Sequence, residues 1–370
     1  MKRNPVASPA LNPKPKTLML VPSVAKRNLS EAIRGDRHPQ MDYFALQQEL
    51  NADILDYASL ETEASPAIVR LARRVGRDVA LAALGYARRR DYDVIFSNGE
   101  NVSIPLALML RRWGQRPLHV FIGHRLSPRK KRPFLKALQP KMDAVFVYAS
   151  TQRDFAIREL GYPAAKAHLI PFHADANFYR PLPALSDAPT NQICSAGLEW
   201  RDYPTLIEAT AGMDVTVKLG ASSPWSKHKN ETEKRELPPN VSARRYEYEE
   251  LRQLYADSRF VVVPLYENDF QAGITTILEG MAMGKAIITT KTTGQIDTIR
   301  DGVNGLYVAP GDVAGWKTAI TRLLNNPDEA ARMGAQGRRD IETTISLDHW
   351  VERIACVIYA LQADRIARTA

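Results

Sequence analysis

Short apolar runs alternate with amphipathic helical patterns along most of this 370-residue sequence, and that alternation narrows its possible folds more than any other feature. Runs of this length are typical of buried strands, and the patterns between them have apolar residues at helical spacing. Strands separated by helices favour a parallel sheet covered by helices on both faces. The expected strands are residues 17–21, 93–96, 119–122, 144–148, 192–196, 215–219, 260–264 and 286–290, and the expected helices are 67–90, 104–112, 203–210, 249–255, 274–283 and 349–362.

The alternation stops at residues 171–189, where Pro181, Pro183 and Pro189 interrupt any regular element. A chain of this length can bury two separate cores. We therefore expect an α/β protein of two Rossmann-like domains that face each other across a cleft, with an N-terminal domain at 1–180 and a C-terminal domain at 190–340. Ligands of such sheets bind at the carboxyl ends of the strands.

The composition, with 45% hydrophobic and 25% charged residues, is that of a soluble globular protein. No apolar run approaches the roughly 20 residues of a membrane-spanning helix, and residues 1–16 lack the apolar stretch of a secretion signal. We therefore expect a cytoplasmic protein with a short disordered N-terminal lead. Cys194 and Cys356 are too few and too far apart for a disulfide framework or a zinc site, and no metal is expected.

The net charge of +9 favours polyanionic partners, namely nucleotide diphosphates, anionic lipid surfaces or nucleic acid. Nucleic acid is the least favoured of these partners, because the basic residues are not interleaved with aromatic ones in a recognised motif. The run SPRKKRPFLK concentrates four basic residues at 129–132, from Arg129 to Arg132. These side chains would hold the protein loosely on the inner face of a membrane, or they are simply solvated loop charges.

The strand at 260–264 leads through a polar loop into a helix that starts near Gly273. A glycine lets a ligand approach the backbone closely, and the free N–H groups and positive dipole of a helix start favour phosphate. We therefore predict phosphate binding at Ala272, Gly273, Ile274 and Thr275, where the threonine adds a hydroxyl donor.

On the same helix, Thr275 and Glu279 are expected to point away from the buried apolar stripe, so that Gln271, Thr275 and Glu279 line one ligand-facing edge. The Glu279 carboxylate could accept two hydrogen bonds from a ribose diol, with Gln271 close to a sugar. The alternative for Glu279 is an ordinary solvent-facing residue of an amphipathic helix.

The segment EGMAMGKAIIT, which begins at Glu279, and its continuation TGQIDTIRDGVNGLYVAPGD resemble the donor-binding motif of the family 4, or group 1, glycosyltransferases of GT-B fold. The resemblance runs in order over residues 93–312 and is strongest after Arg259. It implies that Glu279 binds the ribose of the donor. It also implies that residues 341–370 form a helix crossing back to the N-terminal domain.

Two departures from the family pattern concern the donor sugar and the acceptor. Gln271 stands where the family has a glutamate against the donor sugar, and Glu267 or Asp269 would compensate if the loop bends differently. The glycine-rich acceptor loop that many relatives carry after the first strand is absent. The acceptor therefore stays open among a lipid, a saccharide and a small metabolite.

The segment SAGLEWRDYPTLIEA resembles the place where this family clamps the donor diphosphate. Gly197 matches the family's glycine, and Leu198 stands where an arginine is common. Arg201 is our candidate for the clamp, because a guanidinium can bind phosphate oxygens through two hydrogen bonds, and Lys218 is a weaker candidate. The alternative for Arg201 is an exposed ion pair with Asp202 at a helix start.

The segment HVFIGHRLSP ends an expected strand with His124, where the family often has a histidine near the reacting sugar. An imidazole there could hydrogen-bond a sugar hydroxyl. Asn98, Gly99 and Glu100 close the preceding strand and could face the same cleft. The alternative for His124 is a structural histidine at a strand end.

Together these features predict a retaining hexosyltransferase that uses a nucleotide sugar and needs no cofactor or metal. Arg201 and the helix start at Gly273 would stabilise the departing diphosphate, with His124 and Gln271 near the reacting sugar. A nucleotide-sugar epimerase and a non-catalytic nucleotide-sugar-binding protein remain the alternatives, and Gln271 is the feature that motivates the second.

Overall fold

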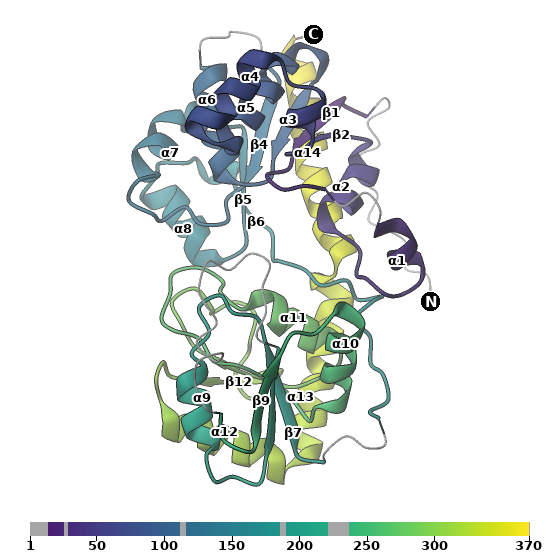
Figure 1. Ribbon diagram of the computed structural model, residues 1–370. Coiled ribbons are helices and arrows are strands. Elements are labelled where there is room, and N and C mark those ends of the chain that lie inside the picture. The colour runs from purple at the N-terminus through teal and green to yellow at the C-terminus, as the bar shows by residue number, and fades with distance from the viewer. Residues whose placement is uncertain (1–13, 26–28, 112–115, 186–189, 221–236, 370) are drawn as a thin grey trace. The chain divides into compact units, whose positions relative to one another are not determined.

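The computed structural model describes residues 14–25, 29–111, 116–185, 190–220 and 237–369 (Figure 1). Nearly all of the predicted N-terminal lead lies outside these residues. The chain divides into two compact units: unit 1 comprises residues 1–28, 41–171 and 348–370, and unit 2 comprises residues 29–40 and 172–347. Unit 2 thus begins inside the predicted linker and also includes a short segment from the N-terminal half.

Unit 1 is built on six described strands, all parallel, in the order β2-β1-β3-β4-β5-β6. The strands are β1 (Thr17–Leu20), β2 (Asp53–Leu55), β3 (Val94–Ser97), β4 (Leu118–Ile122), β5 (Ala144–Val147) and β6 (Ala167–Leu169). The helices are α2 (Asp42–Leu50), α3 (Ser59–Thr62), α4 (Pro66–Val75), α5 (Arg77–Ala87), α6 (Glu100–Leu110), α7 (Arg132–Leu138), α8 (Ser150–Arg158) and α14 (Leu347–Thr369).

Unit 2 repeats this plan with six described parallel strands in the order β12-β11-β10-β7-β8-β9. The strands are β7 (Gln192–Ala196), β8 (Thr216–Gly220), β9 (Val241–Arg244), β10 (Val261–Val263), β11 (Ile287–Thr290) and β12 (Gly305–Val308). The helices are α1 (Ser30–Arg34), α9 (Tyr203–Thr210), α10 (Tyr248–Asp257), α11 (Ile274–Ala282), α12 (Val313–Asn325) and α13 (Pro327–Asp340).

Both faces of the unit 2 sheet are buried, because alternate strand residues pack into different cores. Ile193 and Val262 pack with residues of α9 and α12, whereas Cys194 and Val261 pack with residues of α10 and α11. This arrangement confirms the predicted fold class, an α/β protein with two Rossmann-like domains.

The long helix predicted at residues 67–90 is in fact two helices, which is a correction. Gly76 separates α4 from α5 with a φ of +101°, a conformation that an α-helix does not allow. The C-terminal helix α14 begins at Leu347, and its residues from Asp348 onward belong to unit 1. There the Tyr359 hydroxyl donates to the Glu49 carbonyl of α2 at 3.1 Å.

Residues 29–40, which lie between β1 and α2 in the sequence, pack within unit 2. The Asp36 carboxylate accepts hydrogen bonds from both Arg180 and Arg252, and these bonds, with that to Arg180 first, hold the pKa of Asp36 well below its usual range. The Gln40 amide donates to Asp175 at 2.8 Å. Residues 29–40 therefore belong to unit 2, although they lie between two segments of unit 1 in the sequence.

Candidate functional site

The Arg201 side chain lies at the carboxyl end of the unit 2 sheet and is only 9% exposed. Its guanidinium donates from Nε to the Ala196 carbonyl at 2.9 Å, from Nη1 to the Glu199 carbonyl at 2.7 Å, and from Nη2 to the Thr276 hydroxyl at 3.1 Å. All three acceptors are neutral, and burial lowers the pKa of Arg201. A buried cation held by neutral groups is a favourable place for an anionic ligand.

Arg201 does not form the exposed ion pair with Asp202 that we weighed as the alternative. The Asp202 carboxylate is buried and caps α9, where it accepts hydrogen bonds from the Thr205 amide at 3.3 Å and the Thr205 hydroxyl at 2.7 Å. The Asp202 carboxylate therefore bonds the start of α9, and the Arg201 guanidinium bonds the two carbonyls and the hydroxyl described above.

Two glycines border the Arg201 guanidinium, and they come from the two motifs that the sequence singled out. A Cβ atom on Gly197 would lie 2.6 Å from Nη2, and one on Gly273 would lie 3.3 Å from Nη1. Both residues have positive φ angles, +88° and +76°, which favour glycine. The structure therefore brings Gly197, Arg201 and Gly273 together, although 72 residues separate Arg201 from Gly273.

Gly273 is also the N-cap of α11, where no side chain caps the helix. The first N–H groups of a helix have no intrahelical partner, and the dipole makes this end positive. Ala272 is buried, Ile274 is half-buried and Thr275 is exposed around this helix start. Together with Arg201, the arrangement suits a phosphate group.

Glu279 is buried, with 8% of the residue exposed, whereas Thr275 is exposed, so the two differ in how open they are to solvent. The predicted ligand-facing edge of Gln271, Thr275 and Glu279 stays a prediction. The Tyr255 hydroxyl donates to Oε2 of Glu279 at 2.7 Å. Burial raises the pKa of Glu279 to about 7, while hydrogen bonding to Tyr255 and the charge of Arg201 act in the opposite direction.

The solvent-facing alternative for Glu279 is wrong, because α11 is buried on every side from Thr276 to Ala282. Helical periodicity cannot assign a ligand-facing edge to a helix of this kind. A carboxyl group in such surroundings, with a strongly raised pKa, is typical of functional sites.

The loop that precedes α11 is held by a second loop at residues 292–295. The buried Gln295 side chain donates from Nε2 to the Ala272 carbonyl at 2.9 Å. The Thr293 amide donates to the Glu267 carboxylate at 2.9 Å, so Glu267 holds this second loop. Asp269 is exposed, and Gln271 is half-buried.

The Gln271 side-chain oxygen Oε1 is buried and has no hydrogen-bond partner within the described part of the chain. A buried polar atom without a partner is destabilising, so it is expected to be satisfied by a ligand or water. Gln271 is the residue that stands where the group 1 glycosyltransferases have a glutamate.

Lys218 lies in the middle of β8, opposite Cys194 of β7. It is half-buried there. The loop after β8, residues 221–236, lies outside the described residues. A role for Lys218 in phosphate binding stays a prediction.

In unit 1, His124 follows β4 with an exposed ring. Its Nε2 atom lies 3.3 Å from Oδ1 of Asn98, which follows the neighbouring strand β3, and its backbone amide donates to the Glu100 carboxylate at 3.0 Å. The buried Glu100 also pairs with Lys131 at 2.6 Å. The structure thus gathers His124, Asn98 and Glu100 at one edge of the unit 1 sheet.

Sequence reasoning missed three supporting residues of the unit 2 site: Thr276, Tyr255 and Gln295. Thr276 directly follows Thr275, whose hydroxyl was the predicted donor, yet it is the Thr276 hydroxyl that contacts Arg201. No pattern in the sequence indicates that Tyr255 and Gln295 reach the residues they support, because each contact spans more than 20 residues.

Comparison with known proteins shows which proteins the segment around Arg201 and α11 resembles in sequence. Residues 201–326 match the family model described as glycosyl transferases group 1. Over 98 residues the chain is 35% identical to a D-inositol 3-phosphate glycosyltransferase of Nocardia farcinica, a match that covers 26% of this chain and 20% of that protein. Over 134 residues it is 29% identical to an uncharacterized glycosyltransferase of Methanocaldococcus jannaschii, covering 36% and 37% of the two chains.

Solved structures match over nearly the whole length. The Anabaena protein HepE in complex with UDP-glucose has a TM-score of 0.66 at 16% identity, with 94% of this chain and 100% of that chain covered. Sucrose-phosphate synthase from Thermosynechococcus elongatus has a TM-score of 0.71 at 18% identity, with the same coverage. Residues 201–326 thus resemble the group 1 glycosyl transferases in sequence, and the chain has the GT-B fold of these glycosyltransferases.

Proposed function

We propose that this protein is a retaining glycosyltransferase that moves a sugar from a nucleotide-diphosphate donor to a hydroxyl acceptor. The observation that carries the proposal is the buried Arg201 guanidinium between Gly197 and Gly273, next to the positive end of α11. The family match over 201–326 and the UDP-glucose bound to HepE support a nucleotide sugar as the donor. A hexose is the sugar that the family resemblance implies.

In this proposal, positive charge from the protein stabilises the leaving diphosphate. As the bond between the sugar and the diphosphate breaks, negative charge develops on a phosphate oxygen near Arg201 and the first N–H groups of α11. The acceptor hydroxyl attacks the sugar carbon from the face that the diphosphate leaves, and its proton passes to that phosphate oxygen. The configuration of the sugar is retained, and no metal is required.

The remaining residues are assigned to parts of the donor. The Glu279 carboxylate, held by Tyr255, accepts hydrogen bonds from the ribose diol. The Gln271 amide, whose oxygen lacks a partner in the described chain, binds a hydroxyl of the transferred sugar. Lys218 is a further candidate for phosphate, and His124 on unit 1 is the candidate contact to the reacting sugar.

A thermal-shift screen of the whole protein against UDP, GDP, ADP and their sugar conjugates tests donor binding. A ligand at 100 times its dissociation constant stabilises the folded state by about 2.7 kcal/mol, which such a screen detects. We expect Glu279→Ala to abolish the shift, while the same substitution at the exposed Glu208 of α9 leaves it unchanged. An unchanged shift in folded Glu279→Ala would remove this residue from the site.

A transfer assay then separates the proposal from its alternatives. Incubation of the best donor with lipid, saccharide and small-metabolite acceptors should give a glycosylated product with the donor's anomeric configuration. A converted sugar without any transfer product would favour the epimerase. Nucleotide binding without turnover on any acceptor would favour a binding protein, the reading that Gln271 motivates.

A further inference from the structure

Helix α4 of unit 1 carries a row of basic side chains on the protein surface. None of its residues is fully buried, and only one side, with Ile68 and Ala72, packs against the core of unit 1. Arg70, Arg73 and Arg74 are exposed. The helix is therefore amphipathic, with its basic side turned to solvent.

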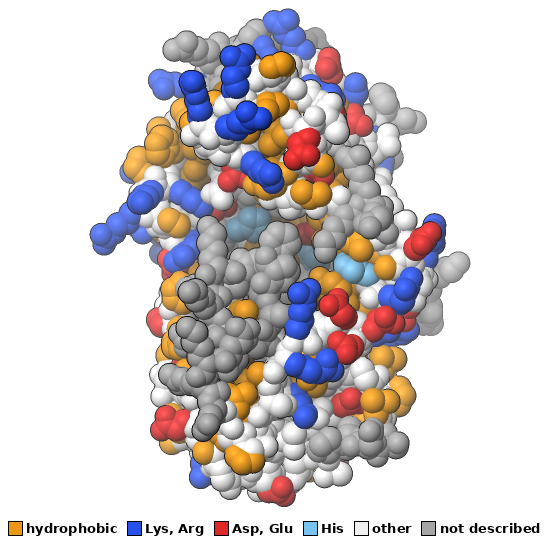
Figure 2. Space-filling view, in the orientation of Figure 1, with side chains coloured by type: hydrophobic (Ala, Val, Ile, Leu, Met, Phe, Trp, Pro, Cys, Tyr) orange, Lys and Arg blue, Asp and Glu red, His pale blue; other side chains and the backbone are white. Residues whose placement is uncertain are grey.

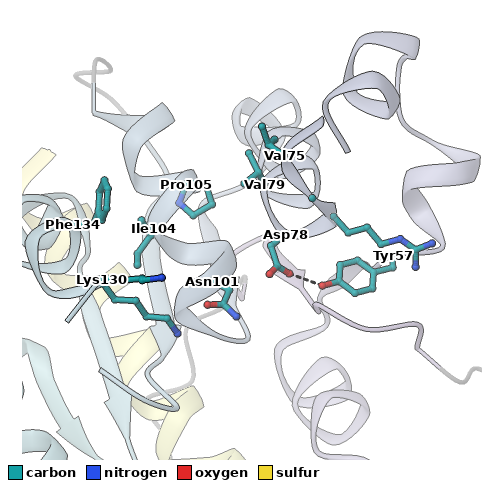
Figure 3. Close-up of a pocket in the computed structure, with 12 residues that line it drawn as sticks. Tyr57, Val75, Asp78, Val79, Asn101, Ile104, Pro105, Lys130 and Phe134 are labelled. Carbon is teal, nitrogen blue, oxygen red and sulfur yellow. Dashed lines mark hydrogen bonds between the residues drawn. The ribbon is translucent and has the colours of Figure 1, made fainter. Parts of the chain in front are cut away.

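Two exposed apolar side chains lie at the C-terminal end of α4 and on α7. Val75, at the end of α4, is 55% exposed, and Phe134 of α7 is 49% exposed. Between them lies a groove of about 350 Å³, in which Ile104 and Pro105 of α6 form part of the wall (Figure 3). Exposed large apolar side chains beside a groove are typical of interaction sites.

Asp78 is the one carboxylate among the described residues that line the groove, and the basic residues there include the exposed Arg77. Asp78 accepts a hydrogen bond from the Tyr57 hydroxyl, as Figure 3 shows. Lys130 adds a further cation to the groove lining. In Figure 2, blue basic side chains surround orange apolar ones over the part of unit 1 that contains α4 and α5.

Of the four basic residues of 129–132, Lys131 is the one held by a buried group, because it pairs with Glu100 at 2.6 Å. Arg132 donates to the Ser127 carbonyl at 2.7 Å and lies over the ring of Phe155, but it stays exposed, as do Arg129 and Lys130. Membrane contact by this loop stays a prediction, and the exposed arginines of α4 add to the basic charge of unit 1.

We propose that this surface, formed by Arg70, Arg73, Arg74, Val75, Lys130 and Phe134, docks unit 1 on an anionic lipid bilayer. The apolar side of α4 packs in the core of unit 1, so α4 offers the bilayer its arginines, which contact the lipid phosphates. Val75 and Phe134 then enter the interface and lose their contact with water. No helix within the described ranges is long and apolar enough to cross a bilayer, so this contact is peripheral.

An anionic bilayer fits the surface better than a nucleic acid does. Cations alone would suit either polyanion, but a protruding valine has neither a hydrogen-bonding group nor a ring for a nucleic acid. The same valine and the phenylalanine gain free energy when they enter an apolar layer. The mixture of exposed cations and exposed apolar groups therefore points to lipid.

Co-sedimentation of the full-length protein with vesicles tests this proposal. We expect binding to vesicles of phosphatidylcholine with phosphatidylglycerol, weak binding to phosphatidylcholine alone, and loss of binding as salt screens the charges. The double variant Arg73→Gln with Arg74→Gln should lower the partition coefficient about 25-fold, because each basic residue near an anionic surface contributes roughly fivefold.

Two further variants make the test specific. Lys317→Gln with Arg332→Gln removes the same charge from exposed positions of unit 2 and should leave vesicle binding unchanged. Val75→Ser with Phe134→Ser keeps every charge and should weaken binding to anionic vesicles by its loss of apolar burial. Thermal unfolding of each variant shows that it is folded.

Three results would overturn the proposal. Equal binding to both kinds of vesicle would remove the role of charge, and an equal loss in the unit 2 control would remove the role of α4. Binding to duplex DNA under conditions in which the protein does not bind anionic vesicles would identify the surface as a nucleic-acid site instead.

Discussion

The carboxyl edges of the two sheets differ in how tightly their polar side chains are held. In unit 2, Arg201 and Glu279 are buried, and each is fixed by hydrogen bonds from distant segments. In unit 1, the Glu100 carboxylate is also buried and pairs with Lys131, but the His124 ring beside it is exposed, with Asn98 as its polar neighbour at 3.3 Å. A site that stabilises developing charge needs groups that are already in place, because reorganisation during the reaction is costly.

We infer from this contrast that the two units carry different parts of the proposed reaction. The buried groups of unit 2 suit the diphosphate, whose charge grows as the bond breaks. The exposed His124 of unit 1 suits a contact with the neutral hydroxyls of the reacting sugar. Substitutions at the unit 2 edge should therefore have the larger effects on catalysis.

The largest effect is expected for Arg201→Ala, which removes the buried cation. Loss of one group that stabilises developing charge typically lowers the rate by roughly 100-fold to 1,000-fold, and we expect kcat/KM for the best donor to fall by about that much. Arg201→Lys should recover only part of the rate, because an ammonium lacks the planar fork of the guanidinium. A decrease of only about threefold or less in folded Arg201→Ala would contradict the proposed clamp.

Glu279→Gln should have the next largest effect, on donor affinity. A hydrogen bond to a charged group contributes roughly 1.5–3 kcal/mol, so the Kd for the nucleotide should rise about 10-fold to 100-fold. Isothermal titration calorimetry measures this change, with Glu208→Gln as the matched control on an exposed helix position. An equal Kd in wild type and variant would show that the ribose lies elsewhere.

The raised pKa of Glu279 also predicts a pH dependence of stability without ligand. Folding raises this pKa from 4.5 to about 7, so the stabilisation that accompanies the protonated form is present below pH 4.5 and is lost as the pH rises through 7. In urea unfolding experiments, Glu279→Gln should remove this pH dependence of the free energy of unfolding. Donor affinity should instead rise with pH, because the ionised carboxylate is the better acceptor for the ribose hydroxyls. If the free energy of unfolding of Glu279→Gln varies with pH as in the wild type, the raised pKa does not belong to Glu279.

A smaller effect is expected for Gln271→Glu, which restores the residue that the family commonly has there. The affinity for the nucleotide without sugar should stay within about twofold, whereas preference among sugar donors should change by about 10-fold, the scale of one hydrogen bond. Competition assays with pairs of sugar nucleotides measure the preference. An equal change in affinity for the free nucleotide would place Gln271 against the diphosphate rather than the sugar.

The smallest effect is expected at the exposed His124 of unit 1. His124→Ala should lower kcat by about fivefold, the scale of one neutral hydrogen bond, and leave nucleotide affinity unchanged. Steady-state kinetics together with calorimetry separates the two quantities. A loss of nucleotide affinity in this variant would break the assignment of different roles to the two edges.

How far prediction from sequence succeeded depended on burial. The strand at Gln192–Ala196 and the helix at Tyr203–Thr210 were predicted to the residue, because the first is buried along its whole length and the buried residues of the second recur at helical spacing. The edge strands β2, β6, β9 and β12 were missed. The first three are partly exposed, whereas β12 is mostly buried but short and begins at a glycine. The spacing of apolar residues predicted one helix over residues 67–90, but the positive φ angle of Gly76 ends the first helix at Val75.

The sequence by itself determined the two parallel α/β units and the glycine-led start of α11, because these depend on apolar runs and on local backbone preferences. Only the tertiary structure decided that Arg201 lies between Gly197 and Gly273 and that Glu279 is buried against Tyr255. Those features depend on side chains that meet across strands and helices far apart in the sequence. The spacing of residues along the chain does not predict contacts between side chains that are far apart in the sequence. Burial at these contacts sets the charge state and the orientation of each buried group.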